Sequence, residues 1–333
     1  MNYKKEFKKI NKYIKNCKCP VLVPHVDPDP DALCACDAIA EYLKTLGVKS
    51  YIGLQAPLFS KYNFIFEDNL GFIVLPGDFD KVKNEIDLVI AVDIGVSSRG
   101  GCWVKDLPEV NKVNIDHHID NDNFGNVNVV DAEYSSTCEM VYDFFRSNKI
   151  NISMKMTKDI YTGIVYDTGS FRYSSTSRQT LNFVGEMVGK YDFDKNDIYE
   201  KLFENKKVES LCLQSRVFES LEIHHDGKIA VTWLNKNGYS KCKADESDAI
   251  ELVRIGSSIQ GVDFSIFIHE KKDKIKVSLR SKSDFNVNKL AREYGGGGHV
   301  KASGFSMQGK VLDVKKQIIP LLIEKYIEFE KNI

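Results

Sequence analysis

The sequence has no run of about 18 consecutive apolar residues, so no membrane-spanning helix is expected. It also has no excess of basic side chains, because 46 Lys and Arg oppose 47 Asp and Glu and the net charge is −1. A nucleic-acid substrate would therefore have to be held locally rather than along a basic surface. The basic N-terminus lacks the apolar stretch of a signal peptide, and its Phe7, Ile10 and Ile14 have the spacing of a docked amphipathic helix.

The C-x-x-C spacing of a structural zinc site is also absent. The chain has eight cysteines, and two C-x-C pairs occur among them, Cys17 with Cys19 and Cys34 with Cys36. Reduced thiols in a cytoplasmic protein are the expected state of these cysteines. Cys34 is interpreted as a buried packing residue rather than a metal ligand.

The pattern that is present predicts two domains in the 333 residues, of which 43% are hydrophobic. Residues 1–190 alternate short apolar runs with helical patterns, which predicts an α/β domain with a doubly wound parallel sheet. Residues 191–221 are predicted to form a helical linker. Residues 222–333 predict a smaller α+β domain with hairpins over 223–234 and 261–281, and a cleft is expected between the domains.

Acids and histidines follow the predicted parallel strands, at the edge of such a sheet where ligands bind. The predicted strand over 19–25 ends at His25, and Asp29 and Asp31 follow it. A second apolar run ends at Asp93, and a third ends at Asp116 and is followed by His117 and His118. A predicted helix ends at Asp167. Carboxylates gathered in this way repel one another unless they keep protons or bind cations. This mixture of carboxylate and imidazole ligands suits Mn²⁺ or a similar ion, and two such ions are the usual arrangement for phosphate-ester hydrolysis.

The second domain contains four consecutive glycines followed by a histidine, in the segment GGGGHVKASGF (295–305). Gly296, Gly297 and Gly298 would let backbone N–H groups approach an oxyanion, and His299 could donate to a phosphate. Arg280 and Ser281 end a predicted strand, where the arginine could grip a phosphate through its planar fork. These residues are therefore candidate substrate contacts.

Six segments together resemble the DHH phosphoesterase superfamily. The segments HVDPDPDA, AVDIG, IDHHIDN and GIVYDTGSFRYSST resemble its first four motifs, and SLRS (278–281) with GGGGHVKASGF resembles the DHHA1 substrate-binding domain. The resemblance spans nearly the whole chain. The sequence departs from the family's usual pattern at Cys34 and Ala35, where Gly-Ser is common, and at Ile94, where a small hydroxyl residue is common.

The resemblance implies a role for each candidate residue. His25 and Asp29 would hold one divalent cation, and Asp31, His117 and Asp167 would hold the other. Asp93 would bridge the two ions. His118 would face the scissile phosphate, and Asp116 would orient the histidines.

The function implied is hydrolysis of short single-stranded oligoribonucleotides to mononucleotides, together with dephosphorylation of pAp. Cleavage of pApA or cyclic di-AMP by the same chemistry is an alternative, and a catalytically silent nucleotide sensor is an alternative of another class. A processive exonuclease is disfavoured because no additional oligonucleotide-binding fold is evident, and a pyrophosphatase is disfavoured by the glycine-histidine segment. The resemblance is also compatible with a homodimer.

Overall fold

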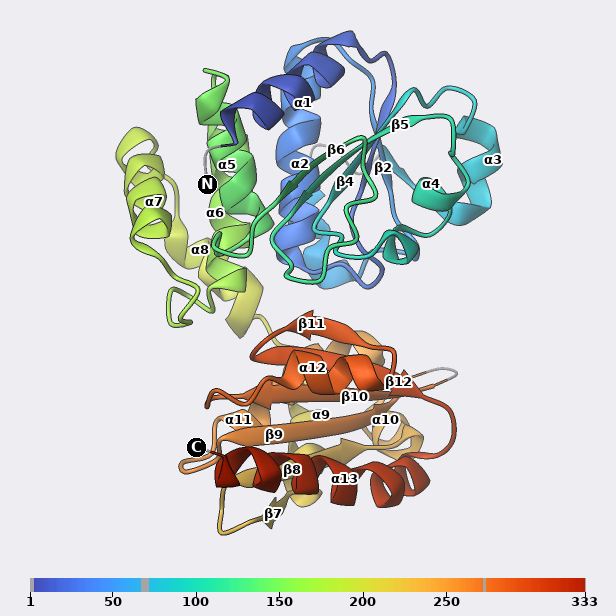
Figure 1. Ribbon diagram of the computed structural model, residues 1–333, viewed down its shortest axis with the longest axis vertical. Helices are drawn as coiled ribbons and strands as arrows, with labels where there is room; N and C mark the ends of the chain where they lie inside the picture. The colour runs from blue at the N-terminus through green and yellow to red at the C-terminus, as the bar shows by residue number, and fades with distance from the viewer. Residues whose placement is uncertain (1–2, 67–71, 272–273, 333) are drawn as a thin grey trace. The chain divides into compact units, whose positions relative to one another are not determined.

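The computed structural model describes residues 3–66, 72–271 and 274–332. The chain divides into two compact units, Met1–Glu204 and Asn205–Ile333. The division falls inside the predicted linker over 191–221. Each unit has its own six-stranded sheet with helices packed against it (Figure 1).

The first unit is built on a parallel sheet, as the apolar runs predict. Its strands lie in the order β3-β2-β1-β4-β5-β6 and every pair is parallel. The chain therefore reverses direction of winding between β1 and β4, and the crevice at such a switch point is where open α/β sheets bind ligands. The strands are β1 (Pro20–Val23), β2 (Tyr51–Gly53), β3 (Ile73–Val74), β4 (Leu88–Val92), β5 (Asn111–Asp116) and β6 (Val127–Val130).

Helices cover both faces of this sheet. Figure 1 shows α1, α2 and α5 on one side and α3 and α4 on the other. Alternate strand residues enter the two cores: Leu22 and Ile90 pack on the first side, Val21 and Val89 on the second. The helical elements are α1 (Lys4–Asn16), α2 (Pro30–Thr45), η1 (Ser60–Phe66), η3 (Pro76–Asp78), α3 (Phe79–Val82), η4 (Ser97–Gly100), α4 (Cys102–Lys105), α5 (Thr137–Ser147), α6 (Met154–Asp167), α7 (Arg178–Lys190), α8 (Lys195–Tyr199) and η5 (Glu200–Glu204).

The N-terminal helix docks as its apolar spacing predicts. Phe7, Ile10 and Ile14 of α1 are buried, and Phe7 makes an edge-to-face contact with Phe144 of α5. Within the described residues, no helix is both long and apolar enough to cross a membrane.

A buried ion cluster fastens α6 to α2, which pack closely along their length. The Lys155 ammonium of α6 donates to the Asp37 carboxylate of α2, to Asp159 Oδ1 at 2.6 Å and to the Ile65 carbonyl at 2.9 Å. Asp37 is fully buried and Asp159 nearly so. Burial and the charge of Asp37 raise the pKa of Asp159 well above its ordinary value. The lysine is thus the cation that makes this pair of buried acids tolerable.

The second unit contains a mixed sheet in the order β11-β12-β10-β9-β8-β7. Both predicted hairpins are present, β7 with β8 and β9 with β10, and β8 runs parallel to β9. Residues 272–273 of the second predicted turn lie outside the described residues. The elements are α9 (Val208–Glu219), β7 (Glu222–His224), β8 (Ile229–Leu234), α10 (Lys236–Cys242), η6 (Glu246–Val253), α11 (Arg254–Ser257), β9 (Phe264–Glu270), β10 (Ile275–Ser281), α12 (Val287–Glu293), β11 (Gly297–His299), β12 (Ala302–Met307) and α13 (Val311–Lys331).

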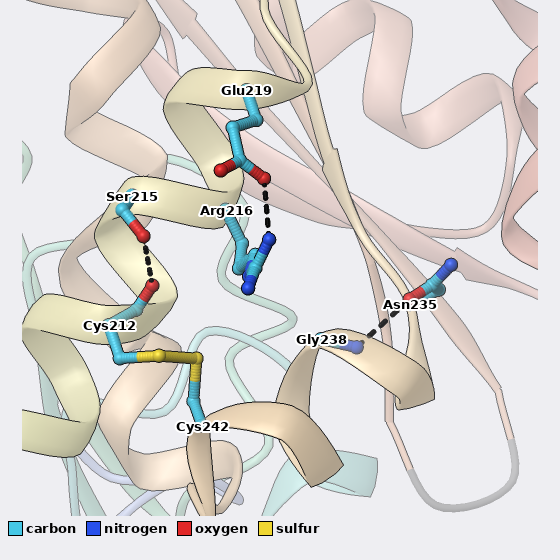
Figure 2. The surroundings of a disulfide bond; sticks show 7 residues. All are labelled: Cys212, Ser215, Arg216, Glu219, Asn235, Gly238 and Cys242. Carbon is cyan, nitrogen blue, oxygen red and sulfur yellow. Dashed lines mark hydrogen bonds and ion pairs between the residues drawn. A yellow bond between two sulfur atoms is a disulfide. The ribbon is translucent and has the colours of Figure 1, made fainter.

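The expectation that all thiols are reduced is wrong for one pair. A disulfide joins Cys212 of α9 to Cys242, the last residue of α10, across 30 positions of sequence (Figure 2). The remaining six cysteines are free. Sequence spacing gave no reason to pair Cys212 with Cys242, because only the packing of the two helices brings their Cα atoms to 5.6 Å.

Candidate metal centre

The predicted ligands converge because the strands and helices that carry them begin or end at the same edge of the first sheet. His25 follows β1, and Asp93 follows β4, the neighbouring strand across the switch point. Asp116 is the last residue of β5, so His117 and His118 follow directly. Asp29 and Asp31 lie at the start of α2, and Asp167 is the last residue of α6.

Asp93 lies in the middle of the cluster. Its Oδ2 is 3.3 Å from His25 Nε2, and its Oδ1 is 3.5 Å from His117 Nε2 and 3.4 Å from His118 Nδ1. The backbone of Asp93 has a φ of +59°, a left-handed conformation that is uncommon outside glycine and that clusters at functional sites. Its N–H is nevertheless satisfied by the Ile115 carbonyl at 2.9 Å. The strand end therefore turns this carboxylate toward imidazoles from two other segments.

The remaining candidates surround this centre. His117 Nε2 lies 3.3 Å from Asp167 Oδ2 and 4.0 Å from Asp31 Oδ2. Asp29 can place a carboxylate oxygen within 4.8 Å of ligand atoms of both His25 and Asp93. The structure thus brings all six predicted metal-ligand side chains together. Asp93 lies close to His25 and Asp29 and also to His117.

Asp29 and α6 show how the local sequence permits this approach. Asp29 is the N-cap of α2, and its Oδ1 accepts from the N–H groups of Asp31 and Ala32. Gly163 of α6 faces Asp31, and a Cβ atom there would lie 2.3 Å from Cys138 Sγ and 2.8 Å from Asp31 Oδ1. Only glycine allows α6 to pass this close to the Asp31 carboxylate.

The electrostatics of the cluster fit divalent cations. Burial, together with the charge of Asp93, raises the pKa of Asp29 and raises that of Asp31 well above its ordinary value. Burial opposes ionisation of Asp93 too, but His118, His25 and His117 outweigh it and hold its pKa well below the usual range. Oxygen and imidazole donors of this kind bind hard or borderline divalent ions, and such ions would relieve the repulsion between the carboxylates. The residues present therefore fit a metal group.

Two of the three histidines, His25 and His117, are oriented by a contact from the ring nitrogen that faces away from the carboxylates. His25 Nδ1 is 2.7 Å from the Val26 carbonyl, and His117 Nδ1 is 3.3 Å from the Tyr134 carbonyl. In both rings the Nε2 atom is the one that faces the carboxylates. This is the arrangement that metal-binding histidines usually have.

His118 is held differently, through an acid. Its Nδ1 is 2.7 Å from Asp116 Oδ1, and the other oxygen of Asp116 accepts from Asn121 Nδ2 at 2.6 Å. Burial lowers the pKa of His118, yet Asp93 and Asp116 together raise it to about 9. Asp116 therefore contacts the histidine that the resemblance assigns to the scissile phosphate.

Sequence reasoning missed two residues beside the cluster. The Thr137 hydroxyl donates to Asp93 Oδ1 at 2.9 Å, and its N–H donates to Asp31 Oδ2 at 2.7 Å. Arg99 Nη2 lies 2.9 Å from His25 Nδ1. Thr137 follows Ser136 in the pattern S-x-x-E, a helix-start signal that marks where α5 begins but not what its first turn contacts.

The candidate phosphate contacts of the second unit lie at strand ends, but the glycine run is not an open loop. Gly297, Gly298 and His299 form β11, which pairs with β12. A Cβ on Gly296 would lie 2.2 Å from the Gly304 carbonyl oxygen, so close strand packing accounts for this glycine. Arg280 and Ser281 end β10, and the Arg280 guanidinium donates to the Leu279 carbonyl at 2.9 Å.

Comparison with known proteins places this architecture in a family. Residues 21–165 match the DHH family, N-terminal domain, and residues 226–328 match the DHHA1 domain. The bifunctional oligoribonuclease and PAP phosphatase NrnA of Bacillus subtilis is 32% identical over 294 residues, which cover 86% of this chain and 88% of that protein. The protein of the same name from Thermus thermophilus is 27% identical over 316 residues, covering 93% and 91%.

A solved structure agrees in fold over the whole length. The exopolyphosphatase-related protein from Bacteroides fragilis superposes with a TM-score of 0.88 and 27% identity, covering 98% of each chain. The chain belongs to the DHH family and carries a DHHA1 domain. Members of this family are metal-dependent phosphoesterases, and the first unit contains a candidate buried metal site.

Proposed function

We propose that this protein hydrolyses short single-stranded oligoribonucleotides to mononucleotides and dephosphorylates pAp. The observation that carries the proposal is the cluster formed by Asp93 and the five other predicted ligand side chains gathered around it. It occurs in a chain that resembles proteins named for these two activities over most of their length.

The proposed metal ligands are those that the resemblance implies, and their proximity in the structure supports the proposal. His25 and Asp29 would hold one divalent cation, Asp31, His117 and Asp167 would hold a second, and Asp93 would contribute to both. We propose Mn²⁺ as the ion, because carboxylate and imidazole donors are mixed in the set. A bound pair of such ions would lower the pKa of water and neutralise charge on the phosphoryl group.

His118 and Asp116 supply the protein's own acid-base chemistry in this proposal. Asp116 fixes the imidazole through its 2.7 Å contact with Nδ1. We propose that the imidazole of His118 contacts a phosphate oxygen or donates a proton to the leaving group. Asn121 holds Asp116 from its other oxygen, so the carboxylate cannot rotate away from the histidine.

We propose that the second unit binds the terminal phosphate of the substrate. Arg280 supplies a planar, permanently charged donor group, and His299 with the N–H groups of Gly297 and Gly298 supplies further donors. Ser281 and Gly296 are weaker candidates, because the Ser281 hydroxyl already donates to the Ser283 carbonyl and the Gly296 N–H to the Ala291 carbonyl, both at 2.9 Å. Only a few phosphates need to be bound on a short substrate, which agrees with the net charge of −1. A cytoplasmic location is proposed because six of the eight cysteines are free thiols, with the Cys212–Cys242 disulfide as the exception. A homodimer is a further proposal that sedimentation would test.

The test is a product profile of the whole protein. Metal is removed with a chelator, and Mn²⁺, Mg²⁺ or Zn²⁺ is restored separately before RNA of two to ten nucleotides, pAp, pApA and cyclic di-AMP are supplied in parallel. We expect no turnover without metal, restoration by Mn²⁺, and the highest kcat/KM on the shortest RNA and on pAp.

Three outcomes discriminate the alternatives. A preference of more than about tenfold for cyclic di-AMP or pApA would replace the proposed substrate with a signalling dinucleotide. Binding of nucleotides without hydrolysis under any metal would favour the sensor. Equal activity with and without chelator would remove the metal site from the proposal.

A further inference from the structure

The first turn of α5 contacts two of the carboxylates of the metal cluster at once. The N–H groups of Thr137 and Cys138 donate to Asp31 Oδ2 at 2.7 Å and Asp31 Oδ1 at 2.9 Å. The Thr137 hydroxyl donates to Asp93 Oδ1 at 2.9 Å. Thr137, Asp31 and Asp93 are all at most 2% exposed, so water does not compete for these bonds. Thr137 therefore contacts both Asp31, which lies at the start of α2 after β1, and Asp93, which follows β4 on the other side of the switch point.

The Thr137 hydroxyl has no evident local task. The cap of α5 is Ser136, whose side chain accepts from the Glu139 N–H at 3.0 Å. Thr137 is the first residue of α5, so no earlier turn of that helix offers its hydroxyl a carbonyl, whereas Thr157 of α6 donates to the Ser153 carbonyl at 2.8 Å. Thr137 instead donates to a carboxylate 44 positions away. Its hydroxyl serves the cluster rather than the helix.

A buried glutamate holds this turn in place. Glu139 is fully buried, and its Oε2 accepts from Ser135 N at 2.9 Å, Ser135 Oγ at 2.6 Å and Thr180 Oγ1 at 2.9 Å. Its Oε1 accepts from Gln179 Nε2 at 3.1 Å. Thr180 belongs to the capping box of α7, so α5 and α7 are fastened at their N-terminal ends. The start of α5 is consequently a fixed frame against which a ligand can be oriented.

Fixing Asp93 matters because it is central to the cluster. Both of its oxygens face histidines, at 3.3 Å on one side and 3.5 Å on the other. Rotation of the carboxylate would move both oxygens away from these positions together. A hydrogen bond from a fixed hydroxyl to Oδ1 restricts that rotation, and outer partners of this kind typically contribute 10–100-fold to metal affinity.

We infer that Thr137 is a positioning residue for the metal centre: its hydroxyl orients Asp93, and its N–H, with that of Cys138, orients Asp31. The inference rests on the metal site of the proposed function. It assigns Thr137 no contact with substrate. Loss of the Thr137 hydroxyl should therefore lower the metal affinity, and should lower turnover only because less metal is bound.

The test compares two substitutions of the same residue in the full-length protein. Thr137→Val keeps the shape and removes the donor, whereas Thr137→Ser keeps the donor. Mn²⁺ binding to metal-free protein is measured by electron paramagnetic resonance of the free ion and by calorimetry. We expect Thr137→Val to bind Mn²⁺ about 10–100-fold more weakly, and Thr137→Ser to stay within about threefold of the wild type.

Thr157→Val is the matched control, because Thr157 is almost equally buried in the same unit and its hydroxyl donates to the carbonyl of Ser153, the N-cap of α6. It should leave Mn²⁺ affinity unchanged. If Thr137→Val does not fold, Thr137→Ala, which adds no atoms, carries the same expectation. Saturating Mn²⁺ should restore most of the kcat of Thr137→Val, which a general loss of structure would not allow.

Wild-type Mn²⁺ affinity in Thr137→Val would overturn the inference, and so would an equal loss in Thr137→Ser. A wild-type protein that binds Mn²⁺ but hydrolyses neither RNA nor pAp would overturn the proposed function while leaving this test intact. A wild-type protein that binds no divalent ion would overturn both.

Discussion

The two units bury different kinds of polar side chain. The first buries Asp31, Asp37, Asp93, Asp116, Glu139 and Asp159 together with three histidines. Among its described residues, the second buries serine, threonine and asparagine side chains and one histidine, His269, but no acid. Buried neutral groups need only hydrogen bonds, whereas buried acids need a cation or a proton. The comparison shows that the demand for positive charge lies in the first unit, at the sheet edge that carries Asp31, Asp93 and Asp116 and between α2 and α6, where Asp37 and Asp159 contact Lys155.

Asp93→Ala is the strongest test of whether the buried acids of the first unit bind a cation. It removes the carboxylate that both sides of the cluster share, so we expect loss of more than about a hundredfold in kcat/KM on pAp, beyond the effect typical of an outer partner. The circular dichroism spectrum should stay unchanged. Asp80→Asn, at an exposed acid of the same unit, is the control. Near wild-type turnover in Asp93→Ala would rule out its shared role.

Lys155→Met tests the other group of buried acids in the first unit. Asp37 and Asp159 would lose their cation, and breaking a buried ion pair in this way costs about 3–5 kcal/mol of folding free energy. Chemical denaturation with the first unit's transition as readout measures it. Lys158→Met, an exposed lysine on the same helix, should change stability by less than about 0.5 kcal/mol. Equal midpoints for the two variants would contradict the role given to Lys155.

Reduction of the disulfide tests the second unit, which contains no buried acid among its described residues. Cys212–Cys242 closes a 30-residue separation, and loss of such a cross-link costs about 2–4 kcal/mol. We expect Cys212→Ser to lower the melting temperature of the second unit and to leave Mn²⁺ binding to the first unit unchanged. Added dithiothreitol should reproduce this effect in the wild type and have none in Cys212→Ser. A change in metal affinity would show that the units are not independent in this respect.

The pH dependence of metal-free stability sharpens the comparison further. Asp93 and Asp116 outweigh burial and raise the pKa of His118 to about 9, from 6.5 in the unfolded chain. The folded state therefore holds this proton more tightly, so its contribution is present below pH 6.5 and is lost as the pH rises through about 9. We expect the free energy of unfolding in chelator to fall by about 1–3 kcal/mol across that window. The fall should be smaller in His118→Gln, and an equal slope there would assign it to another group.

Arg280→Ala has the smallest expected effect and addresses the second unit's proposed phosphate contact. Loss of one charged hydrogen bond should raise the KM for pAp roughly tenfold, with Mn²⁺ affinity unchanged. Lys282→Ala is the control, because that exposed ammonium donates to the Ile259 carbonyl instead. An unchanged KM in Arg280→Ala would remove it from the proposed substrate contacts.

Much of the first unit could be read from apolar patterning. The near-continuous runs that end at Asp93 and Asp116 are indeed parallel strands, and their ends meet because parallel strands share one direction. The conformation of the glycine run at 295–298 could not be predicted in the same way. Whether GGGG forms an open turn or a strand depends on what lies beside it, and Gly304 lies beside it in β12.

The sequence alone determined which residues end the buried strands, and with them the residue types available to bind a cation. Tertiary structure alone decided that α5 begins against Asp31 and Asp93, that Lys155 reaches Asp37, and that Cys212 meets Cys242. These contacts join residues 30 to 118 positions apart through backbone N–H groups, a long flexible side chain and helix packing. None of these leaves a local periodicity or a motif, because the partner is set by how elements pack and not by the order of neighbouring residues.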